Sequence, residues 1–241
     1  MQRHKFIKWI LSFVLILNTM NMSAQDNESN VHPLDPRQQN LAAISALTAT
    51  GNIESLKAQL GSGLDAGLTI NEIKEALVQL YAYCGFPRSL NGVSSFMQVL
   101  EERKKKGITD VAGREATPLK ESSDAYERGR KTLETLTKTP QSKPAPGFGE
   151  FAPRIDAFLK EHLFADIFDS DVLDYQQREL VTISALAAMH GTEGQLQAHI
   201  GIGMNTGISA EQVKSVFDIV EKLVSKEQAE TSRAVFSRMK K

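Results

Sequence analysis

The chain contains two stretches that are near copies of each other. Residues 34–47 reappear as residues 173–186, and residues 60–69 reappear as residues 200–209 after a slip of one residue. An offset of about 140 residues is too long for a solenoid unit, whose repeats span roughly 20–50 residues. The pattern therefore predicts a duplicated domain, and the polar residues that differ between the two copies indicate where a site has been kept.

The residue pattern within each copy is typical of helices. Apolar residues recur three and four positions apart, and no stretch alternates as a strand does. Thr69 and Ser209, each followed three positions later by Glu or Gln, match a capping box. We expect an all-α protein in which the helix that begins after Thr69 stops at residues 85–87, and in which one amphipathic helix covers residues 153–168.

The first 24 residues have the three-part pattern of a secretory signal peptide. A basic start precedes an apolar run at residues 9–17, and the small residues Ser23 and Ala24 precede the expected cut. The apolar run is shorter than the stretch of about 20 residues that a membrane span requires. We expect cleavage after Ala24 and a periplasmic or secreted protein without stable membrane insertion. An uncleaved membrane anchor is the alternative.

Composition excludes several classes of partner. A formal net charge of -1 provides no electrostatic basis for binding nucleic acid. Cys84 is the single cysteine, so an intramolecular disulfide is impossible. The histidines are not spaced as zinc ligands, and no glycine-rich phosphate loop occurs. The sequence therefore indicates no metal and no cofactor.

Changes in composition along the chain suggest four parts. The signal peptide covers residues 1–24 and the first repeat covers residues 34–106. Residues 107–150 read as a linker with one helix, because prolines and glycines gather near its end. The second repeat covers residues 151–241.

One histidine and one helix face are the first candidates for a site. His199 occupies the position that Gln59 has in the first copy, and only the histidine transfers protons near neutral pH. Glu75, Gln79 and Tyr83 are spaced by four and so lie along one side of a helix. The Glu75 carboxylate could orient a histidine or accept a substrate proton. A structural histidine and a solvated surface glutamate are the alternatives, and the second copy has Ser215 in place of Glu75.

Arg178 and Cys84 complete the set of candidates. The planar guanidinium of Arg178 suits a substrate carboxylate, and a surface ion pair with Glu179 or Asp174 is the alternative. Cys84 lies at a helix C-terminus, where the negative end of the helix dipole raises a thiol pKa. It is a buried core residue, a cysteine paired with another molecule, or a working thiol.

Several of these segments resemble the signature of carboxymuconolactone decarboxylase-like proteins. They are residues 72–87, with the sequence EIKEALVQLYAYCGFP, and residues 178–186, followed by 197–200 and 205–207; residues 126–129 resemble the opening of such a domain. The two copies cover nearly all of the mature chain. The resemblance implies a duplicated all-helical bundle that assembles into rings, commonly trimers or hexamers. A duplicated chain suits a trimer with six pseudo-equivalent domains.

The family includes lactone decarboxylases of aromatic catabolism and alkylhydroperoxidase-like thiol reductases that rely on a Cys-x-x-Cys pair. Tyr81 and Pro87 stand three positions before and after Cys84, so the dithiol is absent. The decarboxylase type uses a histidine and a glutamate, which His199 and Glu75 match, but these two residues fall in different copies. Either one composite site forms between the copies, or the ancestral activity has decayed.

The leading hypothesis is therefore an exported lyase that acts by acid/base chemistry on a small carboxylated or lactone-type organic acid, with His199 as the general acid/base. The first alternative is a one-cysteine peroxidase-like antioxidant, in which Cys84 reduces peroxide at the expense of an external thiol. The second is a non-enzymatic oligomeric binding protein on the same fold. A small-molecule ligand and a homo-oligomer are the expected partners.

Overall fold

The computed structural model describes residues 33–119 and 124–239, and all the regular structure in these two ranges is helical. The prediction of an all-α protein is confirmed. Residues from Leu34 onward form one compact unit. No helix in the described ranges combines the length and apolar content that crossing a membrane requires. The predicted signal peptide, residues 1–24, lies outside the described residues.

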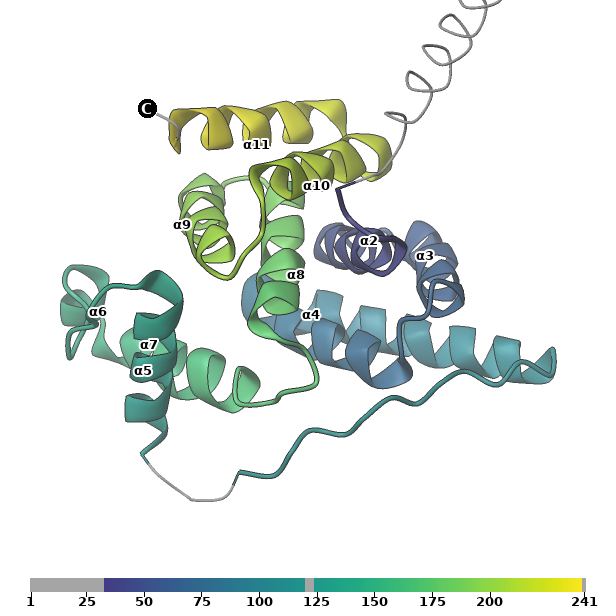
Figure 1. The fold of residues 1–241 in the computed structure, drawn as a ribbon, viewed down its shortest axis with the longest axis horizontal. Helices are drawn as coiled ribbons and strands as arrows, with labels where there is room; N and C mark the ends of the chain where they lie inside the picture. The colour runs from purple at the N-terminus through teal and green to yellow at the C-terminus, as the bar shows by residue number, and fades with distance from the viewer. Residues whose placement is uncertain (1–32, 120–123, 240–241) are drawn as a thin grey trace, which may run out of the picture. The chain divides into compact units, whose positions relative to one another are not determined.

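The two copies contain matching helices (Figure 1). The first copy consists of α2 (Pro36–Thr50), α3 (Ile53–Asp65) and the long helix α4 (Ile70–Lys105). The second consists of α8 (Tyr175–Ala188), α9 (Glu193–Asn205), α10 (Ala210–Leu223) and α11 (Lys226–Met239). Each helix of the first copy thus has its counterpart about 140 residues later, and α4 corresponds to α10 and α11 together.

Local sequence signals set several of the helix boundaries. The side chains of Thr69 and Ser209 each accept a hydrogen bond from the amide three residues on, and both capping boxes are complete. This confirms the predicted helix starts. Asp35 and Asp174 make the same arrangement at the starts of α2 and α8, which the sequence analysis did not predict. Equivalent caps therefore begin the equivalent helices of both copies.

The backbone confirms the predicted interruption at residues 85–87. Gly85 is non-helical, with φ 81° and ψ 159°, and it separates two helical stretches that together make up α4. A positive φ is inexpensive only for glycine, so this residue permits the kink between them. In the second copy the chain leaves the helix at Val224 and Ser225, and α10 and α11 are separate.

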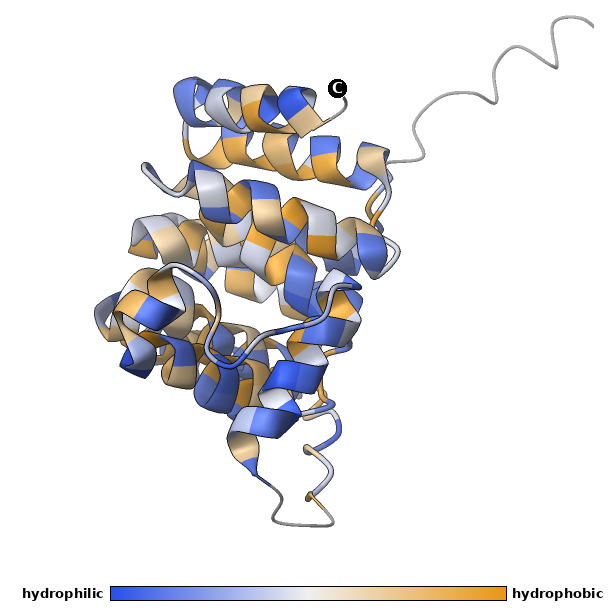
Figure 2. Cartoon of the chain, turned by 90° about the vertical axis from the view of Figure 1, so that its left-hand side faces the viewer, coloured by the Kyte–Doolittle hydropathy of each residue, from blue (hydrophilic) through white to orange (hydrophobic). Residues whose placement is uncertain are grey.

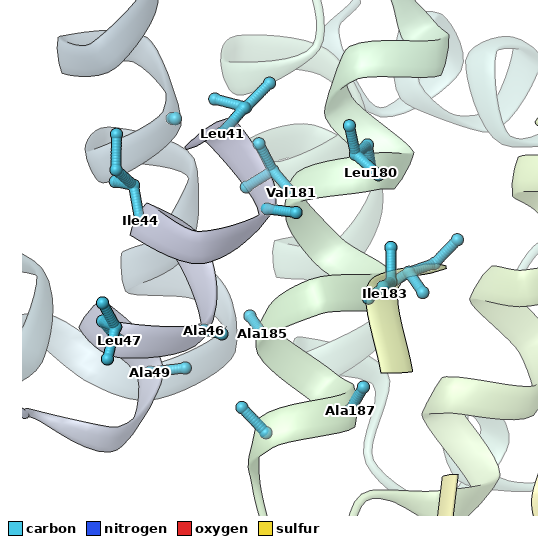
Figure 3. Packing of buried hydrophobic residues seen from close by; sticks show 14 of the residues in the cluster. Leu41, Ile44, Ala46, Leu47, Ala49, Leu180, Val181, Ile183, Ala185 and Ala187 are labelled. Carbon is cyan, nitrogen blue, oxygen red and sulfur yellow. The ribbon is translucent and has the colours of Figure 1, made fainter. Parts of the chain in front are cut away.

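Helices α2 and α8 lie side by side at the centre of the fold (Figure 3). Residues 41–49 of α2 and residues 178–188 of α8 are all buried, so these helices have no solvent face over those stretches. Helix α4 packs on α8, and α10 packs on α2, so each copy covers the central helix of the other. The apolar residues of both copies form one cluster. The copies therefore share one core.

The segment before the second copy contains α5 (Ala125–Thr137), α6 (Phe148–Phe151), α7 (Pro153–Ala157) and the π-helix η1 (Phe158–Ile167). The single amphipathic α-helix predicted for residues 153–168 is therefore wrong in type, because most of it is wound as a π-helix. Such segments are rare and are frequent at functional sites. Figure 2, in which this side of the molecule faces the viewer, shows polar and apolar residues on the same helices, as amphipathic packing requires.

Helix α5 lies unusually close to η1. A Cβ at Gly129 would stand 1.7 Å from the carbonyl oxygen of Lys160, so only glycine fits there. The Lys160 ammonium is fully buried and is held by Asp156 at 2.9 Å and by the Tyr126 hydroxyl at 2.9 Å. These contacts fix η1 against α5.

An extended segment ties the first copy to the start of the second. The carbonyls of Val111 and Ala112 accept hydrogen bonds from the first amides of α4, which have no partner within the helix. Further along, Arg114 and Thr117 bind the carboxylate of Asp171, shortly before α8. The loop predicted for residues 107–121 is observed over its described part and holds the entry to α8 in place.

We expect Gly129→Ala to lower the free energy of unfolding by about 3 kcal/mol, because the new methyl group meets backbone that cannot move aside. Gly201→Ala is the matched control: the added Cβ meets open space. In a helix interior that control should stabilise the protein by about 0.5–1 kcal/mol. Urea denaturation followed by circular dichroism measures both. Equal stability of the two variants would contradict the contact.

Candidate active site

Helix α8 carries two adjacent charged residues, Arg178 and Glu179, in its fully buried stretch. A charge that leaves water must be paired and hydrogen-bonded inside the protein, or it costs several kcal/mol. Their partners come from different helices and define the candidate site.

Arg178 binds the first copy. Its Nη2 atom donates to Glu75 Oε1 at 2.7 Å, and its Nη1 atom donates to Gln79 Oε1 at 2.9 Å. The amide of Gln79 donates in return to the Arg178 carbonyl at 2.9 Å and to Thr182 Oγ1 at 2.9 Å. The guanidinium also lies over the ring of Phe168, with 5.2 Å to the centroid. Helices α4 and α8, one from each copy, are thereby joined through a buried ionic network.

Glu179 binds His199 on α9. The distance from His199 Nδ1 to Glu179 Oε2 is 2.8 Å, and the carboxylate is fully buried. An ionised carboxylate only accepts hydrogen bonds, so Nδ1–H donates and the Nε2 lone pair is left for a ligand. The ring of Tyr83 packs against the imidazole edge to face, with centroids 5.4 Å apart. A carboxylate and an aromatic ring therefore fix the orientation of the His199 side chain.

The hydroxyl of Tyr83 and the second carboxylate oxygen of Glu179 are buried without a hydrogen-bond partner among the described residues. Burial, with a smaller contribution from the negative charge of Glu179, raises the pKa of Tyr83 well above its usual value. Tyr83 therefore keeps its proton at neutral pH and remains a hydrogen-bond donor beside the His199–Glu179 pair.

The first copy retains the same contact without the charges. Counting along the repeat, Asn40 corresponds to Glu179 and Gln59 corresponds to His199. The Gln59 side chain donates a hydrogen bond to the Asn40 side chain. A neutral amide pair thus replaces the carboxylate–imidazole pair, and it cannot transfer a proton near neutral pH.

The second copy has likewise lost the polar face of α4. The positions equivalent to Glu75, Gln79 and Tyr83 follow from the offset of the repeat. In the second copy they are occupied by Ser215, Ile219 and Leu223. The ionisable network forms where α4 of the first copy meets α8 of the second. The equivalent helix contact, between α2 and α10, has no such network among the described residues. The described part of each chain therefore has one such site.

The His199 side chain lines a cavity of about 1070 Å³. The walls come from α4, α5, α6, α7, η1 and α9, and they are largely aromatic and aliphatic. The lining residues are Tyr81, Ala82, Gly85, Phe86, Leu133, Thr137, Phe148, Ile155, Phe158, Leu159, Glu161, His162, Leu163, Phe164, Asp166, Gln195, Ala198, His199 and Ile202. Ligand pockets commonly measure about 300–1,000 Å³, so the space accommodates a substantial organic molecule.

A second histidine shares this cavity. His162 lies on η1, and its Nδ1 atom is 3.1 Å from Asp166 Oδ2. Its ring lies 5.5 Å from that of Tyr81, centroid to centroid. The π-helix thus brings a second carboxylate-paired imidazole to the cavity that contains His199.

Cys84 does not line this cavity, although its neighbours Tyr81, Ala82, Gly85 and Phe86 do. The side chain packs against the central apolar cluster, and its thiol donates to the Leu80 carbonyl at 3.1 Å. Burial raises the pKa of the thiol to about 11, and Arg88 offsets this only in part. Burial, rather than the helix dipole invoked from the sequence, is the main cause of the raised pKa.

The structure thus brings five of the six candidate residues together and leaves Cys84 apart. Glu75 is bonded to Arg178, and the carboxylate on His199 is Glu179. Arg178 lies in the interior rather than in a surface ion pair, and it does not reach the cavity.

Glu179 and His162 were not among the residues predicted from the sequence. The repeat did contain a signal for Glu179. Asn40 and Gln59 are both amides in the first copy, and both equivalent positions in the second copy are ionisable. For His162, the signal was an aspartate four residues later, although the π-helix that places both residues could not be read from that spacing. Among the residues that the structure describes, no group of three or more His, Cys, Asp or Glu side chains could hold a metal ion.

Comparison of the sequence with known protein families gives a match over both copies. Residues 19–95 and residues 153–237 each match the Carboxymuconolactone decarboxylase family. No curated protein matches the chain. The two matches span well over half of the sequence and correspond to the two copies, so the chain belongs to the carboxymuconolactone decarboxylase family, with a duplicated domain.

Proposed function

We propose that the protein is an acid/base enzyme of the lyase type that acts on a lactone-type organic substrate, with His199 as the general acid/base. The observation that carries the proposal is the Nδ1 contact of 2.8 Å between His199 and the buried Glu179, at the wall of a large cavity. A histidine whose Nδ1–H is held by a carboxylate presents a basic Nε2 atom to the ligand.

Glu179 replaces Glu75 in the role that the sequence suggested for a glutamate. The Glu179 carboxylate orients the imidazole and stabilises its protonated form when Nε2 takes a proton from the substrate. Glu75 acts at one remove: it neutralises Arg178, which lies next to Glu179 on α8. The Tyr83 ring limits rotation of the imidazole. Glu75, Gln79, Tyr83 and Arg178 are therefore positioning residues in this proposal.

The thiol alternative has less support than the acid/base proposal. A peroxide-reducing cysteine must be a thiolate and must be reachable. The pKa of Cys84 is raised to about 11, and the thiol lies outside the cavity that holds His199. The non-enzymatic alternative does not account for the histidine that is hydrogen-bonded to a buried carboxylate at the cavity wall.

Export and self-association complete the proposal. The N-terminal signal pattern supports export. Leu90 and Met97 are exposed apolar residues on α4, seven positions apart and therefore on one helix face, and this apolar surface supports a homo-oligomer of the trimer or hexamer type.

For the catalytic proposal, we expect His199→Ala to lower kcat/KM by about 10²–10⁴-fold. Glu179→Gln keeps a hydrogen-bond acceptor but removes the charge, so its loss should be smaller, about tenfold or more. A panel of lactones with and without a carboxylate, followed by chromatography, provides the measurement.

The matched control is Gln59→Ala, which removes the residue at the same repeat position in the first copy. It should leave turnover of the same lactone unchanged. The proposal fails if the wild type consumes no lactone in the panel, or if His199→Ala retains wild-type turnover.

For Cys84, we expect slow alkylation of the native protein at neutral pH. The rate should rise about tenfold per pH unit, because only the thiolate reacts, until pH approaches the raised pKa of about 11. His199→Ala should not change this profile. A fast reaction with a midpoint below about 8.5, lost in His199→Ala, would support the thiol alternative instead.

For export, we expect the protein recovered from the periplasm or medium to begin at Gln25, as measured by intact mass. Light scattering of the same material should give a multiple of the mature chain mass. Retention of residues 1–24 on a membrane fraction would contradict the first expectation, and a monomer would contradict the second.

A further inference from the structure

The cavity beside His199 has an unusual charge distribution for an enzyme of organic acids. Among the described residues, neither lysine nor arginine lines it, whereas two carboxylates, Glu161 and Asp166, do. Arg178 is enclosed with Glu75 and Gln79 and does not reach it. Arg154 stacks over the ring of Phe158 at 5.6 Å without lining the cavity itself.

The two imidazoles do not supply the missing positive charge. His199 is bound to Glu179 and His162 is bound to Asp166, each through Nδ1. If either ring takes up a proton, its carboxylate balances the charge. The remaining acidic residue, Glu161, adds a negative charge at the wall.

The rest of the wall favours hydrocarbon. Aromatic rings from α4 and η1 (Tyr81, Phe86, Phe158 and Phe164) face the space together with aliphatic side chains of η1 and α9. Phe86, Phe148, Ile155 and Phe158 are about half exposed or more in the chain, so apolar surface is available to a ligand. Polar hydrogen-bonding groups at the wall are few and include the two histidines and Gln195.

We propose that this cavity takes a neutral, largely apolar organic molecule, and that it selects against carboxylated substrates. The proposal rests on the proposed function in treating this cavity as the substrate site, and it narrows the substrate class to uncharged lactones or related neutral carbonyl compounds. The substrate group that gives up its proton lies at the Nε2 lone pair of His199, and the hydrocarbon part fills the aromatic walls.

The physical reason is the cost of removing an anion from water without a partner. A carboxylate inside this space would exchange its hydration for apolar contacts and would be repelled by Glu161 and Asp166. A neutral carbonyl compound loses little hydration, and burial of its hydrocarbon part is favourable.

Two fluorescent probes with the same ring framework test the proposal on the intact mature chain, without turnover. N-phenylnaphthylamine is neutral, and anilinonaphthalene sulfonate carries one negative charge. We expect the neutral probe to bind at least about tenfold more tightly, and neutral lactones to displace it before their carboxylated analogues do.

A charge-switch variant locates the binding site and tests its cause. Ala198 is an exposed residue of α9 at the cavity wall, and Ala58 has the same repeat position in the first copy, away from this cavity. Ala198→Arg should reduce the preference for the neutral probe several-fold by supplying the missing cation. Ala58→Arg should leave the preference unchanged.

Equal or tighter binding of the sulfonate by the wild type would overturn the inference. Failure of the neutral probe to bind would overturn it too, and would indicate that a second copy of the chain fills the cavity. An identical effect of the two arginine variants would overturn it as well. These outcomes leave the role of His199 to be judged by turnover. Conversely, a wild type that prefers the neutral probe but consumes no lactone would remove the proposed function alone.

Discussion

The burial of two adjacent charges on α8 is the constraint on which the rest of the structure depends. Arg178 and Glu179 lie on a helix without a solvent face, so each requires a partner inside the protein. Removing one partner of a buried ion pair typically costs about 3–5 kcal/mol, because the other charge is left unpaired. Glu75 and His199 meet this requirement. The Arg178–Glu75 contact therefore joins the two copies, and the Glu179–His199 contact orients the candidate acid/base residue.

Duplication has given the two copies different tasks. The first copy supplies the polar face of α4 and keeps a neutral Asn40–Gln59 contact at its own equivalent of the site. The second copy supplies Arg178, Glu179 and His199, and at the positions equivalent to the polar face of α4 it has one serine and two apolar residues. An amide pair preserves the packing of two helices without the cost of a buried charge. Both copies therefore keep a side-chain contact at this position, and only the second copy has an ionisable one.

The cavity depends largely on the segment from α5 to η1, which precedes α8. Helix α5 and the π-helix η1 supply much of the apolar wall and bring His162 to the same space as His199. The tight contact at Gly129 and the buried Lys160–Asp156 pair fix this wall. Helices α8 and α9 thus position Glu179 and His199, whereas the segment from α5 to η1 forms much of the surface that faces a ligand.

The sequence alone determined the all-α class, the duplication, the family and most helix starts, because caps and apolar periodicity are local signals. It also singled out His199 through its difference from Gln59. Only the tertiary structure decided that Glu179, rather than Glu75, binds His199, that Arg178 is internal, and that Cys84 lies apart from the cavity. These facts depend on how α4, α8 and α9 meet, and residues about 20 to 100 positions apart in the chain become neighbours only when the helices pack.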